Sequence, residues 1–396
     1  MLELKPSIYY CGAQNPDLRI FDIIMKTPLG TSYNAFLIKG GQKSALVETV
    51  KSGFWDVYSQ RVNEVMPLNK IDYLIMNHSE PDHAGSILEL LKVNPGITIV
   101  GTSSAIMFIS HMINAPFNSL VVKKGDSIDL GDRKLVFYPM PNLHWPDTMF
   151  TFDEVSRALF CCDFFGAHLS YAPVLLSLMD NKDEYYRAQT QYFMDIMSPF
   201  IDPYAVNGIK ATRELDPSIL CTGHGPVIDT EISKTLAHYE ALCGHKEKTK
   251  LRIVIAYVSA YGYTKMLAET IAAALKKENE FDVAVHEVTE DNRQMVLDDI
   301  ISSDGFLLGT PTILADALQP IAEITAALHP ILVKGKAASA FGSFGWSGEG
   351  VPNMMQRLQQ LKVKTIEGLR VRFRPSEDEL LLAEKYAEDF AALVRK

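Results

Sequence analysis

Four side chains that can bind a metal ion fall within six residues of one another. They are His78, Glu80, Asp82 and His83, in the segment 77–86. An apolar run that predicts a strand precedes this segment, and loops at strand ends are where α/β proteins build their sites. His78 and Glu80 are two residues apart, so an extended backbone would point both side chains the same way. Asp82 and His83 would face a second position, and the segment therefore predicts two metals side by side.

Further candidate ligands follow downstream, each at the end of a predicted strand or in the loop after it. These are His144, Asp163 and His224. We expect Pro81 to keep the first segment from becoming helical too early, because a proline disfavours helix in the residue before it. His168 follows Asp163 closely enough to contact a metal ligand, whereas the other histidines are interpreted as structural.

The order HxExDH, then H, D and H, resembles the metallo-β-lactamase superfamily and, within it, the flavodiiron proteins. Most hydrolytic zinc members carry HxHxDH, and here Glu80 stands in place of the second histidine. A carboxylate is a harder, anionic donor, so it favours iron over zinc. The resemblance implies two irons with positions left open for O2 or NO. One iron would be held by His78, Glu80 and His144 and the other by Asp82, His83 and His224, with Asp163 joining them.

Three loops in the last third of the chain could bind a phosphate and an aromatic ring system. The first joins a predicted strand to a helix, where backbone N–H groups and hydroxyls form an anion site. The three loops resemble those that hold FMN in flavodoxins, and no GxGxxG dinucleotide motif follows any of the strands. Their residues are Ser259, Ala260, Tyr261, Gly262, Tyr263 and Thr264; Pro311, Thr312 and Ile313; and Ser343, Phe344, Gly345, Trp346, Ser347 and Gly348.

Two features of the flavin loops stand out. Glycines surround Trp346 and leave no room for core packing, so its ring is a candidate to stack on the isoalloxazine. The flavodoxin pattern usually has an asparagine shortly after the Pro-Thr pair, whereas residues 314–317 here read Leu-Ala-Asp-Ala. This departure bears on the flavin hydrogen bonds of that loop and leaves the predicted fold unchanged.

Apolar strands and amphipathic helices that could position these residues alternate along the whole chain. In residues 1–248 the order contains no single βαβ repeat, which predicts a layered α/β sandwich, the αββα sandwich that the metallo-β-lactamase resemblance implies. A short charged break over residues 244–250 leads us to place the domain boundary between 248 and 249. In residues 249–396 five strands alternate with five helices, which predicts a flavodoxin-like, doubly wound parallel sheet.

The apolar patterns also predict the individual elements. Residues 33–50 predict a hairpin, for which Gly40 and Gly41 would supply the positive φ of a tight turn. Further strands are predicted at 71–77, 98–101, 120–122, 134–140, 159–162 and 218–222, and helices from about 86 and at 103–112, 182–197 and 231–242. In the second domain strands are predicted at 252–258, 282–288, 305–309, 336–341 and 369–373, and helices at 265–277, 291–302, 317–328 and 351–361 and from a capping box at 376–379.

Composition limits the class of protein and its partners. The 396 residues are 47% hydrophobic and carry a dispersed net charge of -10, which argues against a nucleic acid or an anionic membrane as partner. The five cysteines form no CxxC pair, so a disulfide framework or a cysteine metal site is not expected. The N-terminal residues lack the apolar core of a signal peptide, and we predict a cytoplasmic protein with reduced thiols.

The resemblance implies an oxidoreductase that reduces O2 to water, NO to N2O, or both. Two ferrous ions and an FMN hydroquinone would hold two electrons each, and the electrons would come from rubredoxin or a similar external donor. The family pattern further implies a head-to-tail homodimer, or a dimer of dimers, and a proton-supplying role for Tyr192. Two alternatives remain at this point: a zinc hydrolase fused to a flavodoxin domain, and a non-catalytic O2 or NO redox sensor.

Overall fold

The computed structural model describes residues 1–22, 25–244 and 250–396, which form two compact units, Met1–Gly244 and His245–Lys396. The boundary predicted between residues 248 and 249 lies outside the described residues. No described helix is both long and apolar enough to cross a bilayer. As predicted, the five cysteines are unpaired, and all of them are buried.

The first unit contains two main β-sheets. The seven-stranded sheet has the order β1-β2-β7-β8-β9-β10-β11, and its β8 to β11 run parallel. The five-stranded sheet is antiparallel from β12 to β15, and β16 pairs with β15 in parallel. The strands are β1 (Leu2–Lys5), β2 (Ile8–Tyr10), β7 (Phe36–Lys39), β8 (Ser44–Val47), β9 (Tyr73–Ile75), β10 (Thr98–Gly101), β11 (Asn118–Val121), β12 (Ser127–Asp129), β13 (Lys134–Pro139), β14 (Met149–Asp153), β15 (Ala158–Cys162) and β16 (Ile219–Thr222). Short hairpins pair β3 (Ala13–Asn15) with β6 (Thr31–Tyr33) and β4 (Ile20–Phe21) with β5 (Met25–Lys26).

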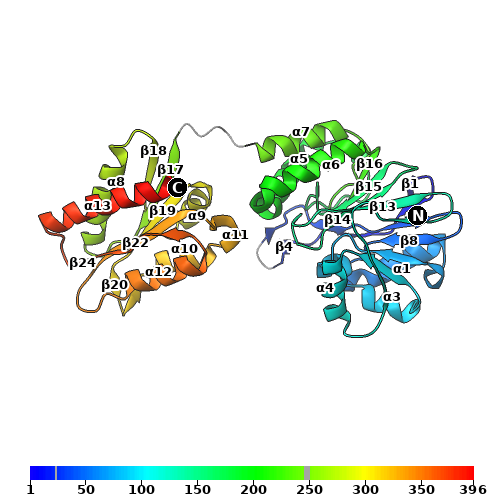
Figure 1. Ribbon diagram of the computed structural model, residues 1–396, viewed down its shortest axis with the longest axis horizontal. Helices are drawn as coiled ribbons and strands as arrows, with labels where there is room; N and C mark the ends of the chain where they lie inside the picture. Colours follow the sequence, from blue (N-terminus) through cyan, green and yellow to red (C-terminus); the bar gives the residue numbers. More distant parts are fainter. Residues whose placement is uncertain (23–24, 245–249) are drawn as a thin grey trace. The chain divides into compact units, whose positions relative to one another are not determined.

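Helices cover the outer face of each sheet, and the two inner faces pack against each other (Figure 1). Successive strand side chains point to opposite faces, so Leu37 packs under the helices while Phe36 contacts Phe160 of the other sheet, with ring centroids 5.3 Å apart. The seven-stranded sheet is covered by α1 (Trp55–Val65), α3 (Ile87–Val93) and α4 (Ser103–Ile113), and the five-stranded sheet by α5 (Lys182–Tyr192), α6 (Val206–Leu215) and α7 (Ile232–Cys243). These four layers are the predicted αββα sandwich.

One local prediction in this unit was wrong. The hairpin β7–β8 forms, but neither glycine of its turn has a positive φ. Gly40 is required for space instead, because a Cβ there would lie 2.4 Å from the Cβ of Leu130.

The prediction for Pro81 is confirmed. Glu80 before it stays extended, with φ -57° and ψ 143°, and the short helix α2 (Pro81–Ala84) begins only at the proline. A proline is favoured at this position because its missing N–H would have no partner there in any case.

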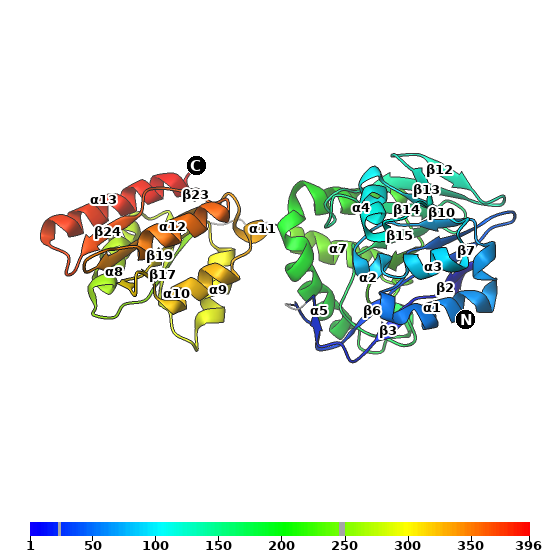
Figure 2. The same ribbon diagram turned by 90° about the horizontal axis from the view of Figure 1, so that it is seen from below.

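The second unit is a parallel sheet with helices on both faces, as predicted. Its strand order is β18-β17-β19-β22, and both β23 and β24 pair with β22. One face is covered by α8 and α13, and the other by α9, α10 and α12, which lie beside one another in Figure 2. The strands are β17 (Leu251–Tyr257), β18 (Phe281–Glu287), β19 (Gly305–Gly309), β22 (Ala337–Phe344), β23 (Lys364–Thr365) and β24 (Leu369–Arg372), and the helices are α8 (Tyr263–Lys276), α9 (Arg293–Ser302), α10 (Gln319–Ala327), α11 (Pro330–Val333), α12 (Gly350–Gln360) and α13 (Glu377–Val394).

A small hairpin occupies the segment in which the sequence departs from the flavodoxin pattern. Strands β20 (Thr312–Ile313) and β21 (Asp316–Ala317) pair around a two-residue turn. Both turn residues, Leu314 and Ala315, have positive φ, a conformation that costs non-glycine residues about 1–3 kcal/mol each. The hairpin also delays the following helix, which begins at Gln319 rather than at the predicted residue 317.

The last helix, α13, begins with the predicted capping box. The Ser376 hydroxyl accepts from the N–H of Glu379, whose carboxylate in turn accepts from the N–H of Ser376. We expect Ser376→Ala to lower the free energy of unfolding of the second unit by about 1 kcal/mol, because the cap acceptor is lost. Urea unfolding measures the change, and Ser376→Asn, which keeps a cap acceptor, is the control. An unchanged midpoint in the alanine variant would contradict the prediction.

Candidate metal centre and flavin site

Four separate chain segments bring the predicted metal ligands together in the first unit. His78 and Glu80 follow β9, and Asp82 and His83 lie in α2. The other three follow or end strands of the second sheet: His144 after β13, Asp163 after β15 and His224 after β16. All are buried or half-buried, and their ligand atoms form two adjacent groups.

The first group consists of His78, Glu80, His144 and one oxygen of Asp163. Oε2 of Glu80 lies 3.1 Å from Nε2 of His78 and 3.3 Å from Nε2 of His144. Oδ2 of Asp163 lies 3.4 Å and 3.2 Å from the same two nitrogens. Four ligand atoms about 2.1 Å from one metal lie about 3.3 Å apart in a tetrahedral arrangement, so these spacings fit a metal ion.

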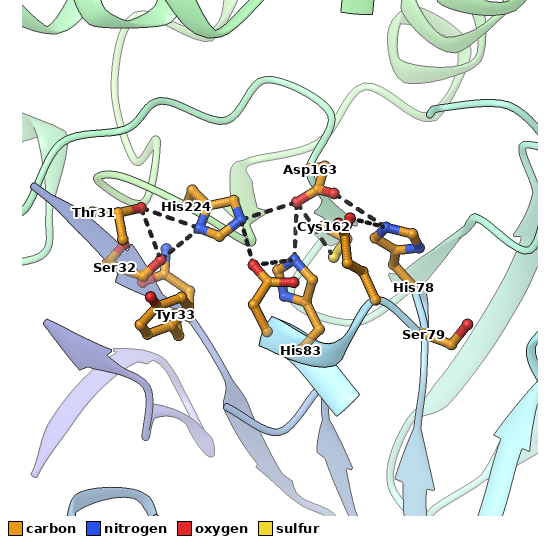
Figure 3. Close-up of polar contacts among 12 residues, drawn as sticks. Thr31, Ser32, Tyr33, His78, Ser79, His83, Cys162, Asp163 and His224 are labelled. Atoms are coloured by element: carbon orange, nitrogen blue, oxygen red, sulfur yellow. Dashed lines mark hydrogen bonds and ion pairs between the residues drawn. The ribbon is translucent and has the colours of Figure 1, made fainter. Parts of the chain in front are cut away.

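The second group consists of Asp82, His83, His224 and the other oxygen of Asp163. Oδ2 of Asp82 lies 3.1 Å from Nε2 of His224 and 3.5 Å from Nε2 of His83. Oδ1 of Asp163 lies 3.4 Å and 3.0 Å from those nitrogens. Figure 3 shows Asp163 with His78 on one side and with His83 and His224 on the other. A single carboxylate therefore presents one oxygen to each group, which is the geometry of a ligand shared by two metals.

The histidines and carboxylates of the centre shift each other's pKa values. Burial lowers the pKa of His83, but the carboxylates of Asp82 and Asp163 outweigh burial and raise it to about 10. Burial raises the pKa of Glu80, but hydrogen bonds with His144 and His78 outweigh it and hold the carboxylate well below its ordinary value. The carboxylates are thus anionic, as metal ligands must be.

The thiol of Cys162 also lies beside the centre, and its sulfur is close to His83 and Asp163. Burial raises the pKa of this thiol well above its ordinary value, and nearby Glu48 raises it further. A metal ligand must be the thiolate, so Cys162 would have to lose this proton in order to bind a metal.

Several residues that the sequence did not point to form hydrogen bonds with the ring nitrogens of the metal-ligand histidines that face away from the centre. The carboxylate of Asp147 accepts from Nδ1 of His78 at 3.2 Å and from the Ser79 hydroxyl at 2.7 Å. Nδ1 of His224 donates to the carbonyl of Ser32 at 2.6 Å. Asp147 had a detectable signal, since it is a carboxylate three residues after His144; the Ser32 carbonyl had none, because any residue carries one.

His168 and Tyr192 lie beside His224, with their ring centroids 5.1 Å and 5.9 Å from its ring. Nδ1 of His168 contacts the Thr31 hydroxyl at 3.0 Å, and the same hydroxyl lies 3.4 Å from Nδ1 of His224. Nε2 of His168 and the Tyr192 hydroxyl are buried and have no hydrogen-bond partner among the described residues. Burial lowers the pKa of His168 to about 3, and nearby His224 lowers it too, so this ring is neutral.

The three predicted flavin loops converge at the carboxyl edge of the parallel sheet in the second unit. The hydroxyls of Thr264 and Ser343 lie 2.9 Å apart and join the first loop to the third. The Thr312 hydroxyl accepts from the N–H of Gly350 at 3.1 Å and joins the second loop to the segment after the third. Gly262 takes a positive φ directly before α8, where a Cβ would meet only open space.

The loops expose large apolar side chains, an arrangement that fits a flat aromatic ligand. Trp346 is 89% exposed, Tyr261 83% and Leu314 96%. Folded proteins rarely leave large apolar patches uncovered unless the patch binds a partner or a ligand. The open face of Trp346, the hydroxyl-lined loops and the start of α8 together fit an isoalloxazine ring with a phosphate tail.

Comparison with known proteins agrees with both units. The family model described as ODP family beta lactamase matches residues 31–225, and the flavodoxin model matches residues 255–386. A flavo-diiron protein of Clostridium acetobutylicum is 39% identical over 396 residues, with 98% of each chain covered. A type A flavoprotein of Rhodobacter capsulatus is 36% identical, covering 95% of this chain and 88% of the relative.

Similarity to solved structures supports the fold. The rubredoxin oxygen:oxidoreductase of Desulfovibrio gigas superposes with a TM-score of 0.71 at 23% identity, covering 100% of this chain and 98% of that one. Fold and site together define a metallo-β-lactamase-like domain with a two-metal centre, joined to a flavodoxin-like domain. The chain belongs to the flavodiiron protein family.

Proposed function

We propose that this protein is a diiron flavoprotein that reduces O2 to water, NO to N2O, or both. The proposal is carried by one observation above the others: the two oxygens of Asp163 face two separate groups of metal ligands. The named activities of relatives agree, because they include an anaerobic nitric oxide reductase flavorubredoxin of Salmonella typhi that is 31% identical over 398 residues.

Seven side chains would hold the two irons. His78, Glu80 and His144 bind one, Asp82, His83 and His224 bind the other, and Asp163 bridges them. Supporting this assignment, His78, Glu80, His144 and Asp163 form one group of closely spaced ligand atoms, and Asp82, His83 and His224 form another. Oδ1 of Asp163 lies 3.0 Å and 3.4 Å from the two histidines of the second group. Glu80 supports iron over zinc, since a carboxylate is a harder donor than the imidazole that hydrolytic zinc relatives carry at this position.

FMN would be held by residues 259–264, 311–313 and 343–348, with the phosphate at the start of α8 and the ring against Trp346. Two ferrous ions and a reduced FMN store four electrons, which suffice to convert O2 to two waters. Two electrons suffice to couple two NO molecules to N2O and one water. Rubredoxin or a similar external carrier would resupply the electrons, in agreement with the name of the Desulfovibrio gigas enzyme.

His168 and Tyr192 would line the metal centre beside His224. Burial raises the pKa of Tyr192 well above its ordinary value, as does the charge of Asp163. The hydroxyl therefore keeps its proton, and Tyr192 can donate a hydrogen bond toward a bound substrate. The neutral ring of His168 can accept one, since its Nε2 has no other partner among the described residues.

Electron transfer bears on the assembly of the protein, and the state of its cysteines bears on its location in the cell. We expect a head-to-tail homodimer, or a dimer of dimers, because the flavin must come within electron-transfer reach of a pair of irons. The unpaired cysteines fit a reducing compartment such as the cytoplasm.

The test is anaerobic reduction followed by parallel O2 and NO consumption, with iron and FMN quantified in the same preparation. We expect two irons and one FMN per chain and multiple rapid turnovers with at least one gas. Zinc in place of iron would favour a hydrolase fused to a flavodoxin domain. Binding of a gas without turnover would favour a sensor, and either result would overturn the proposal.

A further inference from the structure

The three fully buried histidines of the centre differ in what their second ring nitrogen contacts. Nδ1 of His78 lies 3.2 Å from the carboxylate of Asp147. Nδ1 of His224 donates to the uncharged carbonyl of Ser32. Nδ1 of His83 is buried and has no hydrogen-bond partner among the described residues. A carboxylate therefore supports only one of these three imidazoles.

The carboxylate of Asp147 is held rigidly in this position. It is fully buried, and its Oδ2 accepts from both the N–H and the hydroxyl of Ser79, each at 2.7 Å. The hydroxyl of Thr102, the N-cap of α4, donates to the backbone carbonyl of Asp147 at 2.9 Å. Asp147 is thus fixed at both its side chain and its backbone, and no basic side chain of the described residues other than His78 pairs with it.

A carboxylate that accepts the Nδ1 proton of a ligating histidine fixes the ring tautomer and makes Nε2 more basic. We propose that Asp147 is a positioning residue that makes the two halves of the metal centre unequal. The half formed by His78, Glu80 and His144 is the more strongly electron-donating one. Each half has one carboxylate of its own, but among the described residues only this half has a second carboxylate hydrogen-bonded to a ligand histidine; the buried Glu48 interacts with His83 only through its charge. This inference rests on the proposed function, since it requires two irons.

The decisive variant is Asp147→Asn in iron-loaded holoprotein. The amide has the same shape and can still accept from Ser79, but it lacks the negative charge that polarises His78. We expect iron in one of the two positions to be retained about 10- to 100-fold more weakly in competition with a chelator. We also expect Mössbauer spectra of the reduced, ⁵⁷Fe-enriched protein to show one iron signal shifted and the other unchanged.

A second variant keeps the proposal testable if Asp147→Asn does not fold. Ser79→Ala removes the hydroxyl that shares Oδ2 with His78, so the carboxylate becomes a stronger acceptor for Nδ1. We expect the same iron signal to shift in the opposite direction, a result that simple loss of structure cannot produce. Asp153→Asn is the matched control: Asp153 is also a fully buried carboxylate, but it pairs with Arg133 and contacts no metal-ligand histidine.

The outcomes separate this inference from the proposed function. Wild-type protein that binds no iron would overturn the proposed function. Wild-type protein with two irons, together with unshifted signals and unchanged iron retention in both Asp147→Asn and Ser79→Ala, would overturn only the inference. A shift of both iron signals by equal amounts in Asp147→Asn would also overturn it, because the effect must be confined to one half of the centre.

Discussion

Asp163→Asn abolishes O2 and NO consumption while the protein keeps its FMN: this is the largest effect we expect of any single substitution. Oδ1 of Asp163 lies 3.0 Å from Nε2 of His83, and Oδ2 lies 3.2 Å from Nε2 of His144. An asparagine offers one oxygen and one NH2 group, and the NH2 group cannot bind a metal. One of the two metals must therefore lose its fourth protein ligand, and the shared negative charge disappears as well.

Iron content, FMN content and gas consumption, measured on one preparation, check this prediction. We expect fewer than two irons per chain, the wild-type amount of FMN and turnover at the background rate. Asp153→Asn makes the same change at a buried carboxylate outside the centre, and it should keep both irons and activity. Wild-type rates in Asp163→Asn would show that the ligand assignment is wrong.

The seven metal ligands are predictable because their chemistry is local to short motifs. His78, Glu80, Asp82 and His83 lie within six consecutive residues after β9, and the other three each follow an apolar strand that the sequence reveals. What joins them is the packing of the two sheets, which brings the end of β9 in one sheet beside the ends of β13, β15 and β16 in the other. That long-range step came from the family resemblance rather than from any single segment.

The residues that hydrogen-bond to the metal-ligand histidines are harder to predict from the sequence. The sequence places Asp147 near His144, but it does not show that Asp147 contacts His78, sixty-nine positions earlier in the chain. Ser32 acts through its backbone carbonyl, which side-chain chemistry does not reveal. The strand β14 was not predicted, although its sequence MFTFD alternates apolar and polar residues from Phe150 to Asp153; all five residues are buried.

Turn geometry was the least predictable feature of the fold. A Gly-Gly pair predicts positive φ, yet Gly40 and Gly41 lack it. Leu314 and Ala315 carry no such signal and adopt positive φ in the β20–β21 turn. In both cases packing or pairing with distant parts of the chain overrides the local preference of the residue.

Gly342→Ala should have the complementary effect to Asp163→Asn, with loss of FMN and retention of both irons. A Cβ on Gly342 would lie 1.8 Å from the backbone oxygen of Thr310, far inside contact distance. The N–H of Thr310 also donates to the carbonyl of Phe341 at 3.0 Å, so the backbone there cannot retreat without breaking that bond. The added methyl group must push the loop after β19 away from the end of β22, and both segments contribute to the proposed flavin site.

Overpacking of this kind costs about 1–3 kcal/mol, and every 1.4 kcal/mol weakens binding about tenfold. We therefore expect FMN affinity to fall about 5- to 140-fold, as measured by flavin fluorescence on dilution. The iron content should not change, because the metal ligands all lie in the other unit. Gly53→Ala is the control, since a Cβ at Gly53 would meet no atom within 4 Å. If Gly342→Ala binds FMN as tightly as the wild type, the flavin does not depend on the spacing of these two segments, and the site must lie elsewhere on the second unit.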